Sequence, residues 1–326
     1  MQVYTSPAEV PSSVAPSAVA IGKFDGVHAG HRRVIGALLA VAAEKQLSAV
    51  AVTFDRHPLA LLNPELCPVP LVSNEQKLEL LADTGLDATL MLTFDRELSE
   101  MAPEDFIRSI LVDALGAKVV LVGSDFRFGT KGSGTAESLI ESGKEFGFEV
   151  RLVDDVLVTA NAFGEEPRRA SSTWIRELLS KGLITEAATL LGHLPAIRSV
   201  VVPGAQRGRE LGYPTANLSP DLEGFVPTDG VYAAWLTVEG ERYGAAVSIG
   251  NNPTFEGVPD RQVEAHVLDA KIDLYGKLVE LAFVDYIRPM SRFENADALV
   301  TQMGRDEQRI RDLLGYPPAE RPIFSL

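Results

Sequence analysis

A strand, a glycine-rich turn and the start of a helix follow one another near the beginning of this 326-residue chain. The apolar residues 18–21 predict a short strand, and residues 22–31 read Gly-Lys-Phe-Asp-Gly-Val-His-Ala-Gly-His. A helix-like stretch continues over residues 32–45. At such a junction, backbone N–H groups and the helix dipole bind phosphate. The run therefore predicts a phosphate-binding turn at the end of a strand.

Two histidines of this turn, His28 and His31, are three residues apart. On a helical first turn, residues at this spacing share a face, so both imidazoles could donate hydrogen bonds to one group of phosphate oxygens. A metal site is the alternative, but zinc would need a third ligand, and no suitable partner lies nearby in the sequence. The run matches neither a Walker loop nor the dinucleotide-binding glycine pattern. We interpret the histidines as phosphate ligands in nucleotide chemistry.

The first half of the chain alternates strand-like and helix-like stretches. This spacing predicts a parallel sheet with helices on both faces, which binds ligands at the carboxyl ends of its strands near a topological switch point. The further predicted strands are residues 48–54, 88–92, 118–122 and 149–153, and the further predicted helices are residues 74–84, 103–115 and 136–146.

Beyond about residue 185, short strands and long polar loops dominate, and this pattern predicts a closed β-barrel. We therefore expect an α/β domain over residues 1–185 and a β domain over residues 186–326. The predicted elements are a helix at 184–191, strands at 197–202, 231–238, 243–249, 262–269 and 278–287, and a terminal helix at 295–314.

The net charge of −15 argues against nucleic acid as a partner, because nucleic acid binding depends on Lys and Arg meeting phosphates. Acidic residues outnumber basic ones on both sides of residue 185. With Cys67 as its one cysteine, the chain forms no intramolecular disulfide. It shows no signal-peptide pattern and no apolar run long enough to span a bilayer. We expect a cytoplasmic protein, with no membrane partner.

Two further segments of the first domain carry polar and aromatic groups. Residues 123–129, Gly-Ser-Asp-Phe-Arg-Phe-Gly, follow a predicted strand at the same end of the sheet as the histidine turn, although a loop with a buried aromatic pair would look the same. Residues 171–176, Ser-Ser-Thr-Trp-Ile-Arg, open a helix. Their hydroxyls could cap that helix, or could hold triphosphate oxygens together with the arginine one turn later.

In the second domain, residues 204–218 read Gly-Ala-Gln-Arg-Gly-Arg-Glu-Leu-Gly-Tyr-Pro-Thr-Ala-Asn-Leu. Glycines and arginines at this density suit a loop whose backbone approaches phosphates closely. In an extended segment Thr215 and Asn217 face the same side, and their neutral oxygens suit Mg²⁺. A plain polar turn is the alternative. Alternation also places Glu264 and His266 on one face of a strand, where His266 alone would be read as a packed histidine.

Together these motifs resemble the prokaryotic bifunctional riboflavin kinase/FAD synthetases. The resemblance rests on the Phe-Asp-Gly-x-His-x-Gly-His, Phe-x-Phe-Gly, Ser-Ser-Thr-x-Ile-Arg and Pro-Thr-Ala-Asn segments, in that order, and covers residues 18–326. It implies a Rossmann-like nucleotidyltransferase domain that adenylylates FMN to FAD, releasing pyrophosphate. It also implies a riboflavin kinase barrel that makes FMN. ATP would be the co-substrate of both reactions and Mg²⁺ the cofactor.

The resemblance also implies roles for individual residues. His28 and His31 would contact the α-phosphate of ATP, Glu264 would be the base for the riboflavin 5′-hydroxyl, and Thr215 and Asn217 would bind Mg²⁺. Further nucleotide and flavin contacts in the first domain would come from Gly22, Phe24, Asp25, Gly26, Asp125, Phe126, Arg127, Phe128, Ser171, Ser172, Thr173 and Arg176. In the second domain they would come from Gly204, Arg207, Gly208, Arg209, Gly212, Pro214, Thr215 and Asn217.

The chain departs from the family pattern in the loop after the second strand of the α/β domain. Residues 54–58 read Phe-Asp-Arg-His-Pro, where the family usually has Phe-x-Pro-His-Pro. Arg56 removes a fixed backbone angle and adds a charge that could meet phosphate, and His57 could be a loop anchor or a ligand.

Two rival functions are a kinase with a degenerate first domain and a flavin-binding sensor. The intact His28, His31 and Arg176 argue against the first, and the retained Glu264 argues against the second. A homo-oligomer is possible.

Overall fold

The computed structural model describes residues 1–158, 167–204, 212–250, 261–270 and 272–316. The chain divides into two compact units, Met1–Ser172 and Thr173–Leu326. This division lies earlier than residue 185 because α7 (Ser172–Ser180) is tied to the second unit: the N–H of Thr228 donates to the carbonyl of Leu179. Where the two functions meet along the chain stays a prediction.

The first unit contains a six-stranded parallel sheet, as predicted, with the strand order β1-β4-β3-β2-β5-β8. The chain runs outward from β2 through β3 and β4, then crosses to the other side of β2 to form β5. The topological switch point therefore lies between β2 and β5. The strands are β1 (Gln2–Tyr4), which was not predicted, β2 (Ser17–Ile21), β3 (Ser48–Phe54), β4 (Ala88–Leu92), β5 (Ala117–Gly123) and β8 (Glu149–Val153).

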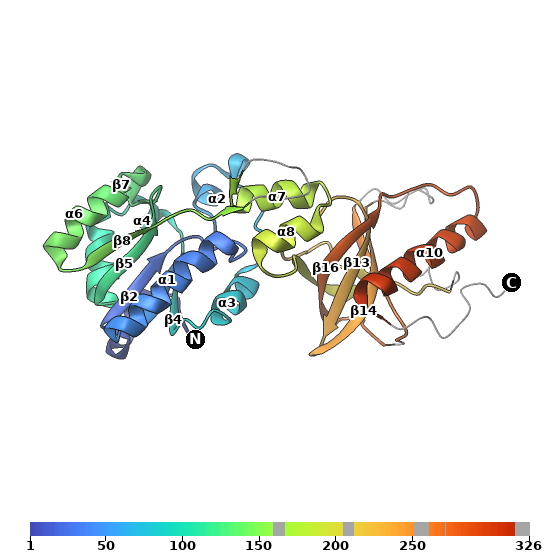
Figure 1. Cartoon of the computed structure of the whole chain (residues 1–326), viewed down its shortest axis with the longest axis horizontal. Helices are drawn as coiled ribbons and strands as arrows, with labels where there is room; N and C mark the ends of the chain where they lie inside the picture. Colours follow the sequence, from blue (N-terminus) through green and yellow to red (C-terminus); the bar gives the residue numbers. More distant parts are fainter. Residues whose placement is uncertain (159–166, 205–211, 251–260, 271, 317–326) are drawn as a thin grey trace. The chain divides into compact units, whose positions relative to one another are not determined.

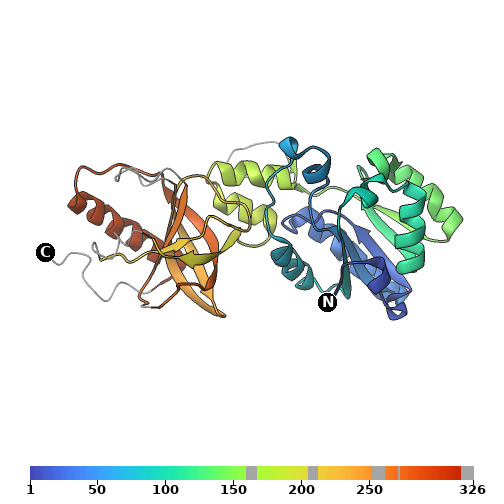
Figure 2. The same ribbon diagram turned by 180° about the vertical axis from the view of Figure 1, so that it is seen from behind.

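Helices cover both faces of this sheet, so every residue of β2 is buried. Ala20 packs with Leu38 and Leu81 on the face of α1 and α3, whereas Ile21 packs with Ile107 on the other face. Figures 1 and 2 show the two faces from opposite sides. The helices are α1 (Ala29–Lys45), α3 (Asn74–Ala82), α5 (Pro103–Phe106), continued by a π-helix (Ile107–Ala114), and α6 (Ala136–Phe146), with short α2 (Pro58–Leu62) and α4 (Arg96–Glu100), which were not predicted.

The second unit is a closed antiparallel barrel with the strand order β11-β12-β15-β14-β13-β16, and pairing of β11 with β16 closes it. The predicted barrel is confirmed. The sequence did not reveal β12 as a strand, because its three residues are too few for alternation to show. The strands are β11 (Ala196–Val202), β12 (Ala216–Leu218), β13 (Gly230–Val238), β14 (Glu241–Gly250), β15 (Gln262–Val267) and β16 (Leu278–Arg288), and α8 (Ile184–Leu191) precedes them.

The terminal helix α10 (Ala296–Leu314) packs on the barrel through Ile310, which belongs to one buried cluster with Val231 and Ala233. Next to it, Arg311 is only 1% exposed and forms ion pairs of 2.7 Å with Asp269 and with Glu307. The charge-assisted bond to Asp269 joins the helix to the segment just after β15, whereas the bond to Glu307 lies within α10. Among the described residues, no helix is long and apolar enough to cross a membrane.

Candidate active sites

The backbone of the turn after β2 is strained. Phe24, Gly26 and Val27 have φ angles of 48°, 77° and 39°, a region that costs free energy for residues other than glycine and most of all for a β-branched one. The side chains of Phe24 and Val27 are at most 1% exposed. Burial of these two side chains therefore stabilises a turn that its backbone alone would disfavour.

His28 and His31 lie together at the N-terminus of α1. The helix begins at Ala29, three residues earlier than predicted, so that His28 is the N-cap and His31 lies in the first turn. Their rings stack with centroids 3.8 Å apart and planes inclined by 21°. Gly30 leaves room for this arrangement, because a Cβ at that position would lie 3.1 Å from Cε1 of His28.

A hydrogen bond to His28 and the burial of His31 limit the protonation of the two imidazoles. Nδ1 of His28 accepts the N–H of Gly30 at 3.2 Å, so the neutral ring carries its proton on Nε2. Burial lowers the pKa of His31 well below its usual range, and electrostatic interactions with His28, Lys23 and Arg169 act in the same direction. Nδ1 of His31 is buried without a hydrogen-bond partner in the described part of the chain. Each neutral ring therefore carries a single N–H.

Asp25 anchors the turn to two other segments. Its Oδ1 accepts the N–H of Leu71 at 2.8 Å, and its backbone carbonyl accepts the hydroxyl of Ser172 at 3.0 Å. The buried Lys77 donates to the carbonyl of Phe54 at 2.6 Å. Burial lowers the pKa of Lys77, whereas the nearby carboxylates of Asp25 and Asp55 raise it. These bonds join the turn to the segment before α3 and to Ser172, and join α3 to the end of β3.

Two predicted contact residues of this turn are packed against each other. A Cβ at Gly22 would lie 3.2 Å from the ring of Phe24, and that ring lies edge-on to His31 with centroids 5.3 Å apart. Gly22 and Phe24 therefore pack beside the histidines, and Gly26 contributes the positive φ angle that the turn requires.

The loop after β5 faces the same switch point. Asp125 forms an ion pair of 2.8 Å with Arg169, and this hydrogen bond lowers the pKa of the carboxyl. Phe126 and Phe128 stack with centroids 5.4 Å apart, and Phe128 is buried in the core. The aromatic pair is therefore present, as expected both for a binding loop and for a plain loop. Arg127 is exposed in β6 (Arg127–Phe128).

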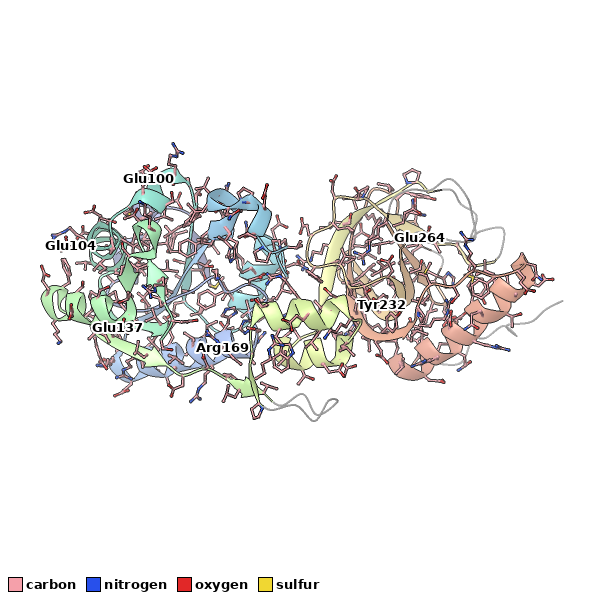
Figure 3. The ribbon with its side chains drawn as sticks, turned by 90° about the horizontal axis from the view of Figure 1, so that it is seen from above. Glu100, Glu104, Glu137, Arg169, Tyr232 and Glu264 are labelled. Carbon is pink, nitrogen blue, oxygen red and sulfur yellow. The ribbon has the colours of Figure 1, made fainter. Side chains whose placement is uncertain are left out.

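Arg169, labelled in Figure 3, was not predicted from the sequence as a site residue. Its positive charge helps to lower the pKa of His31. It forms ion pairs with Asp125 and, at 3.0 Å, with Asp155. The doubled arginine two residues before Ser171 was the available signal.

The helix that carries the predicted phosphate clamp begins at Ser172, directly after Ser171. Ser172 donates its hydroxyl to the carbonyl of Asp25, so it contacts the histidine turn. The division between the two units falls between Ser172 and Thr173. A role for Thr173 and Arg176 in the same site therefore stays a prediction.

In the loop after β3, the charge of Arg56 is paired with the neighbouring residue. Arg56 forms an ion pair of 3.0 Å with Asp55. His57 is the N-cap of α2, since its Nδ1 accepts the N–H of Leu59 at 3.1 Å, and its Nε2 lies 3.2 Å from Nζ of Lys23. His57 is thus a loop anchor whose other nitrogen faces the histidine turn.

In the barrel, strand pairing brings the predicted kinase residues together. Asn217 on β12 lies directly opposite Glu264 on β15, and the hydroxyl of Thr215 donates to Oε2 of Glu264 at 3.3 Å. Val263 and Ala265 are buried in the barrel, which puts the half-buried Glu264 on the opposite face of its strand. Figure 3 labels Glu264 on the barrel.

Gly204 completes this cluster from a third segment. A Cβ at Gly204 would lie 2.2 Å from Nδ2 and 2.6 Å from Oδ1 of Asn217, so no larger residue fits beside that amide. Gly212 has a φ of 83°, and the carbonyl of Pro214 is hydrogen-bonded by His266. The predicted Arg207, Gly208 and Arg209 lie outside the described residues.

The donor chemistry of this cluster fits Mg²⁺. The hydroxyl of Thr215 and the amide oxygen of Asn217 are neutral hard ligands, with the carboxylate of Glu264 beside them. The hydroxyl hydrogen of Thr215 points to Glu264, which leaves its lone pairs for a cation. Within the described residues, no cluster of His, Cys, Asp and Glu offers a metal site of another kind.

Comparisons with known proteins assign a family to each half of the chain. The family model for FAD synthetase matches residues 10–165, and the model for riboflavin kinase matches residues 191–314. The crystal structure of a macrolide-efflux protein from Streptococcus pneumoniae has the same fold, with a TM-score of 0.81, 30% identity and coverage of 95% of this chain and 98% of that one.

Curated relatives match along most of their length. The bifunctional riboflavin kinase/FMN adenylyltransferase of Escherichia coli strain K12 is 36% identical over 90% of this chain and 92% of its own. The protein of that name from Listeria monocytogenes is 34% identical over 90% and 91%. The chain belongs to the bifunctional riboflavin kinase/FMN adenylyltransferase family.

Proposed function

We propose that the chain makes FMN from riboflavin in its second unit and FAD from FMN in its first, consuming ATP in both steps. The observation that carries this proposal is the presence of two chemically different clusters in the halves matched by the two family models. The histidine turn lies within residues 10–165, and the Thr215–Asn217–Glu264 cluster lies within residues 191–314.

In the first unit, a phosphate oxygen of FMN attacks the α-phosphorus of ATP, and the bond to the bridging oxygen of pyrophosphate breaks. No side-chain nucleophile is needed, and catalysis consists of positioning and charge stabilisation. Nε2–H of His28, one N–H of His31 and the N-terminus of α1 stabilise the charge on the α-phosphate. Ser172, with Thr173 and Arg176 of the helix that it opens, would hold the departing pyrophosphate, and Ser171 would be a further nucleotide contact. Asp125, Phe126, Arg127 and Phe128 border the nucleotide and flavin.

In the second unit, the 5′-oxygen of riboflavin attacks the γ-phosphorus of ATP, and ADP leaves. Glu264 accepts the proton of that 5′-hydroxyl. Gly204, Arg207, Gly208, Arg209 and Gly212 would contact the phosphates, as the sequence predicts. Thr215 and Asn217 would hold Mg²⁺, which would supply positive charge to neutralise the phosphates. A cytoplasmic location and a possible homo-oligomer belong to the same proposal.

The test is to incubate the purified chain with riboflavin, ATP and Mg²⁺ and to separate the flavins by chromatography. FMN should appear first and FAD should follow. Formation of FMN alone, with no FAD from supplied FMN, would mean that the first unit is degenerate. Formation of neither flavin would leave a flavin-binding protein as the better reading.

A further inference from the structure

His266 joins the loop before β12 to the strand that carries Glu264. Its Nδ1 lies 2.9 Å from the carbonyl oxygen of Pro214. A carbonyl can only accept, so Nδ1 must be the protonated nitrogen. The ring of Tyr213 also packs edge-on against His266, with centroids 5.1 Å apart. Two consecutive residues before Thr215 are thus held by one imidazole.

This bond lies just beyond the end of the pairing between β12 and β15. The pairing of β12 with β15 ends at Ala216 and Ala265. Pro214 has no N–H, so it cannot donate to the neighbouring strand and extend the ladder. Without another contact, Thr215 would leave the sheet at the point where its hydroxyl meets Glu264. The imidazole of His266, on the same strand as Glu264, supplies that contact.

We propose that His266 is a positioning residue of the kinase site, whose Nδ1–H holds the Pro214 carbonyl and so keeps Thr215 beside Glu264. The inference rests on the proposed kinase function, because it assigns His266 to the same Mg²⁺–nucleotide site. It goes beyond packing, since a residue that only fills space would act through its volume and not through one hydrogen bond.

The test compares His266→Phe with His266→Asn in the full chain. Phe keeps the ring shape but cannot donate, whereas the amide nitrogen of Asn stands close to where Nδ1 stood. The readouts are the affinity for Mg²⁺–ADP by isothermal titration calorimetry and the Mg²⁺ concentration at half-maximal riboflavin phosphorylation. His266→Phe should weaken both by about 10-fold, the scale of one lost hydrogen bond, and His266→Asn should recover most of that loss.

His193→Phe is the matched control. Nδ1 of His193 lies 3.0 Å from the carbonyl of Leu194, so the variant removes the same kind of contact in the same unit, away from β15. It should leave both readouts unchanged. Adenylylation of supplied FMN should be normal in all three variants and so reports that the first unit is intact.

Two results would overturn the assignment of His266: wild-type Mg²⁺–ADP affinity in His266→Phe, or equal losses in His266→Phe and His266→Asn. If His266→Phe does not fold, His266→Gln replaces it, because its amide extends one carbon farther and should not restore the bond. Failure of the proposed function would look different, since the wild-type chain itself would then neither bind Mg²⁺–ADP nor phosphorylate riboflavin, and the inference would fall with it.

Discussion

The two candidate sites are built in opposite ways. The histidine turn is one run of consecutive residues whose strained backbone is held by the buried Phe24 and Val27. The kinase cluster is assembled from three segments, at Gly204, Thr215–Asn217 and Glu264, by the pairing of β12 with β15. A local turn depends on side chains that fix its shape, whereas an assembled cluster depends on register. The two sites should therefore fail through different substitutions.

The largest effect is expected for Glu264→Gln, which keeps the size of the side chain but removes the proton acceptor. Riboflavin phosphorylation should fall by about 10²–10⁴ in kcat, the range for loss of a general base. Adenylylation of supplied FMN should be unchanged. Both rates are measured by chromatography of the flavins, and near wild-type phosphorylation would mean that Glu264 is structural.

In the histidine turn, His28→Asn separates capping from chemistry. Asn is a favoured N-cap, so α1 should keep its start, but the Nε2 donor is lost. FMN adenylylation should fall by about 10²–10³ while riboflavin phosphorylation stays normal. Thermal unfolding checks that the helix cap is kept. A variant that unfolds like wild type and still adenylylates FMN at the normal rate would remove His28 from the chemistry.

For the assembled cluster, Gly204→Ala should act through Asn217, because the new methyl group would overlap the Asn217 amide. We expect the Mg²⁺ concentration at half-maximal kinase activity to rise by about 10-fold, the equivalent of about 1.4 kcal/mol. In a double-mutant cycle with Asn217→Ala, the second substitution should add little. Additive effects would mean that Gly204 does not act through this amide.

The smallest effect concerns the pH dependence of the first unit. The pKa of His31 is lowered in the folded chain, so below about pH 6.5 the unfolded chain takes up a proton that the folded chain does not. His31 should therefore make the first unit lose stability as pH falls, by at most about 1.4 kcal/mol per pH unit. Hydrogen exchange in α1 measures this slope, and His31→Gln should flatten it. An unchanged slope in the variant would contradict a neutral, buried His31.

The same contrast explains what could be predicted from the sequence. The strands over residues 48–54, 88–92 and 149–153 and the helix over 136–146 are confirmed at their predicted bounds, because local residue type and periodicity mark them in the sequence. The early start of α1 was missed because a histidine N-cap is not an ordinary capping residue. The turn could be recognised from ten consecutive residues.

Long-range contacts were harder to predict. The sequence suggested that Thr215 and Asn217 share a face, but not that Glu264 lies opposite Asn217 or that Gly204 adjoins its amide, since strand register does not appear in a single strand. The ion pair of Arg169 with Asp125 and the contact of His266 with Pro214 were missed because they join residues far apart in the sequence.

The most direct test of the account is a mixture of His28→Asn and Glu264→Gln supplied with riboflavin, ATP and Mg²⁺. If each site acts alone, the first variant accumulates FMN, the second makes almost no product, and the mixture makes FAD because FMN released by one is adenylylated by the other. A mixture that forms no FAD, although each variant retains its own half-reaction, would contradict independent sites, as would the loss of both half-reactions in either variant.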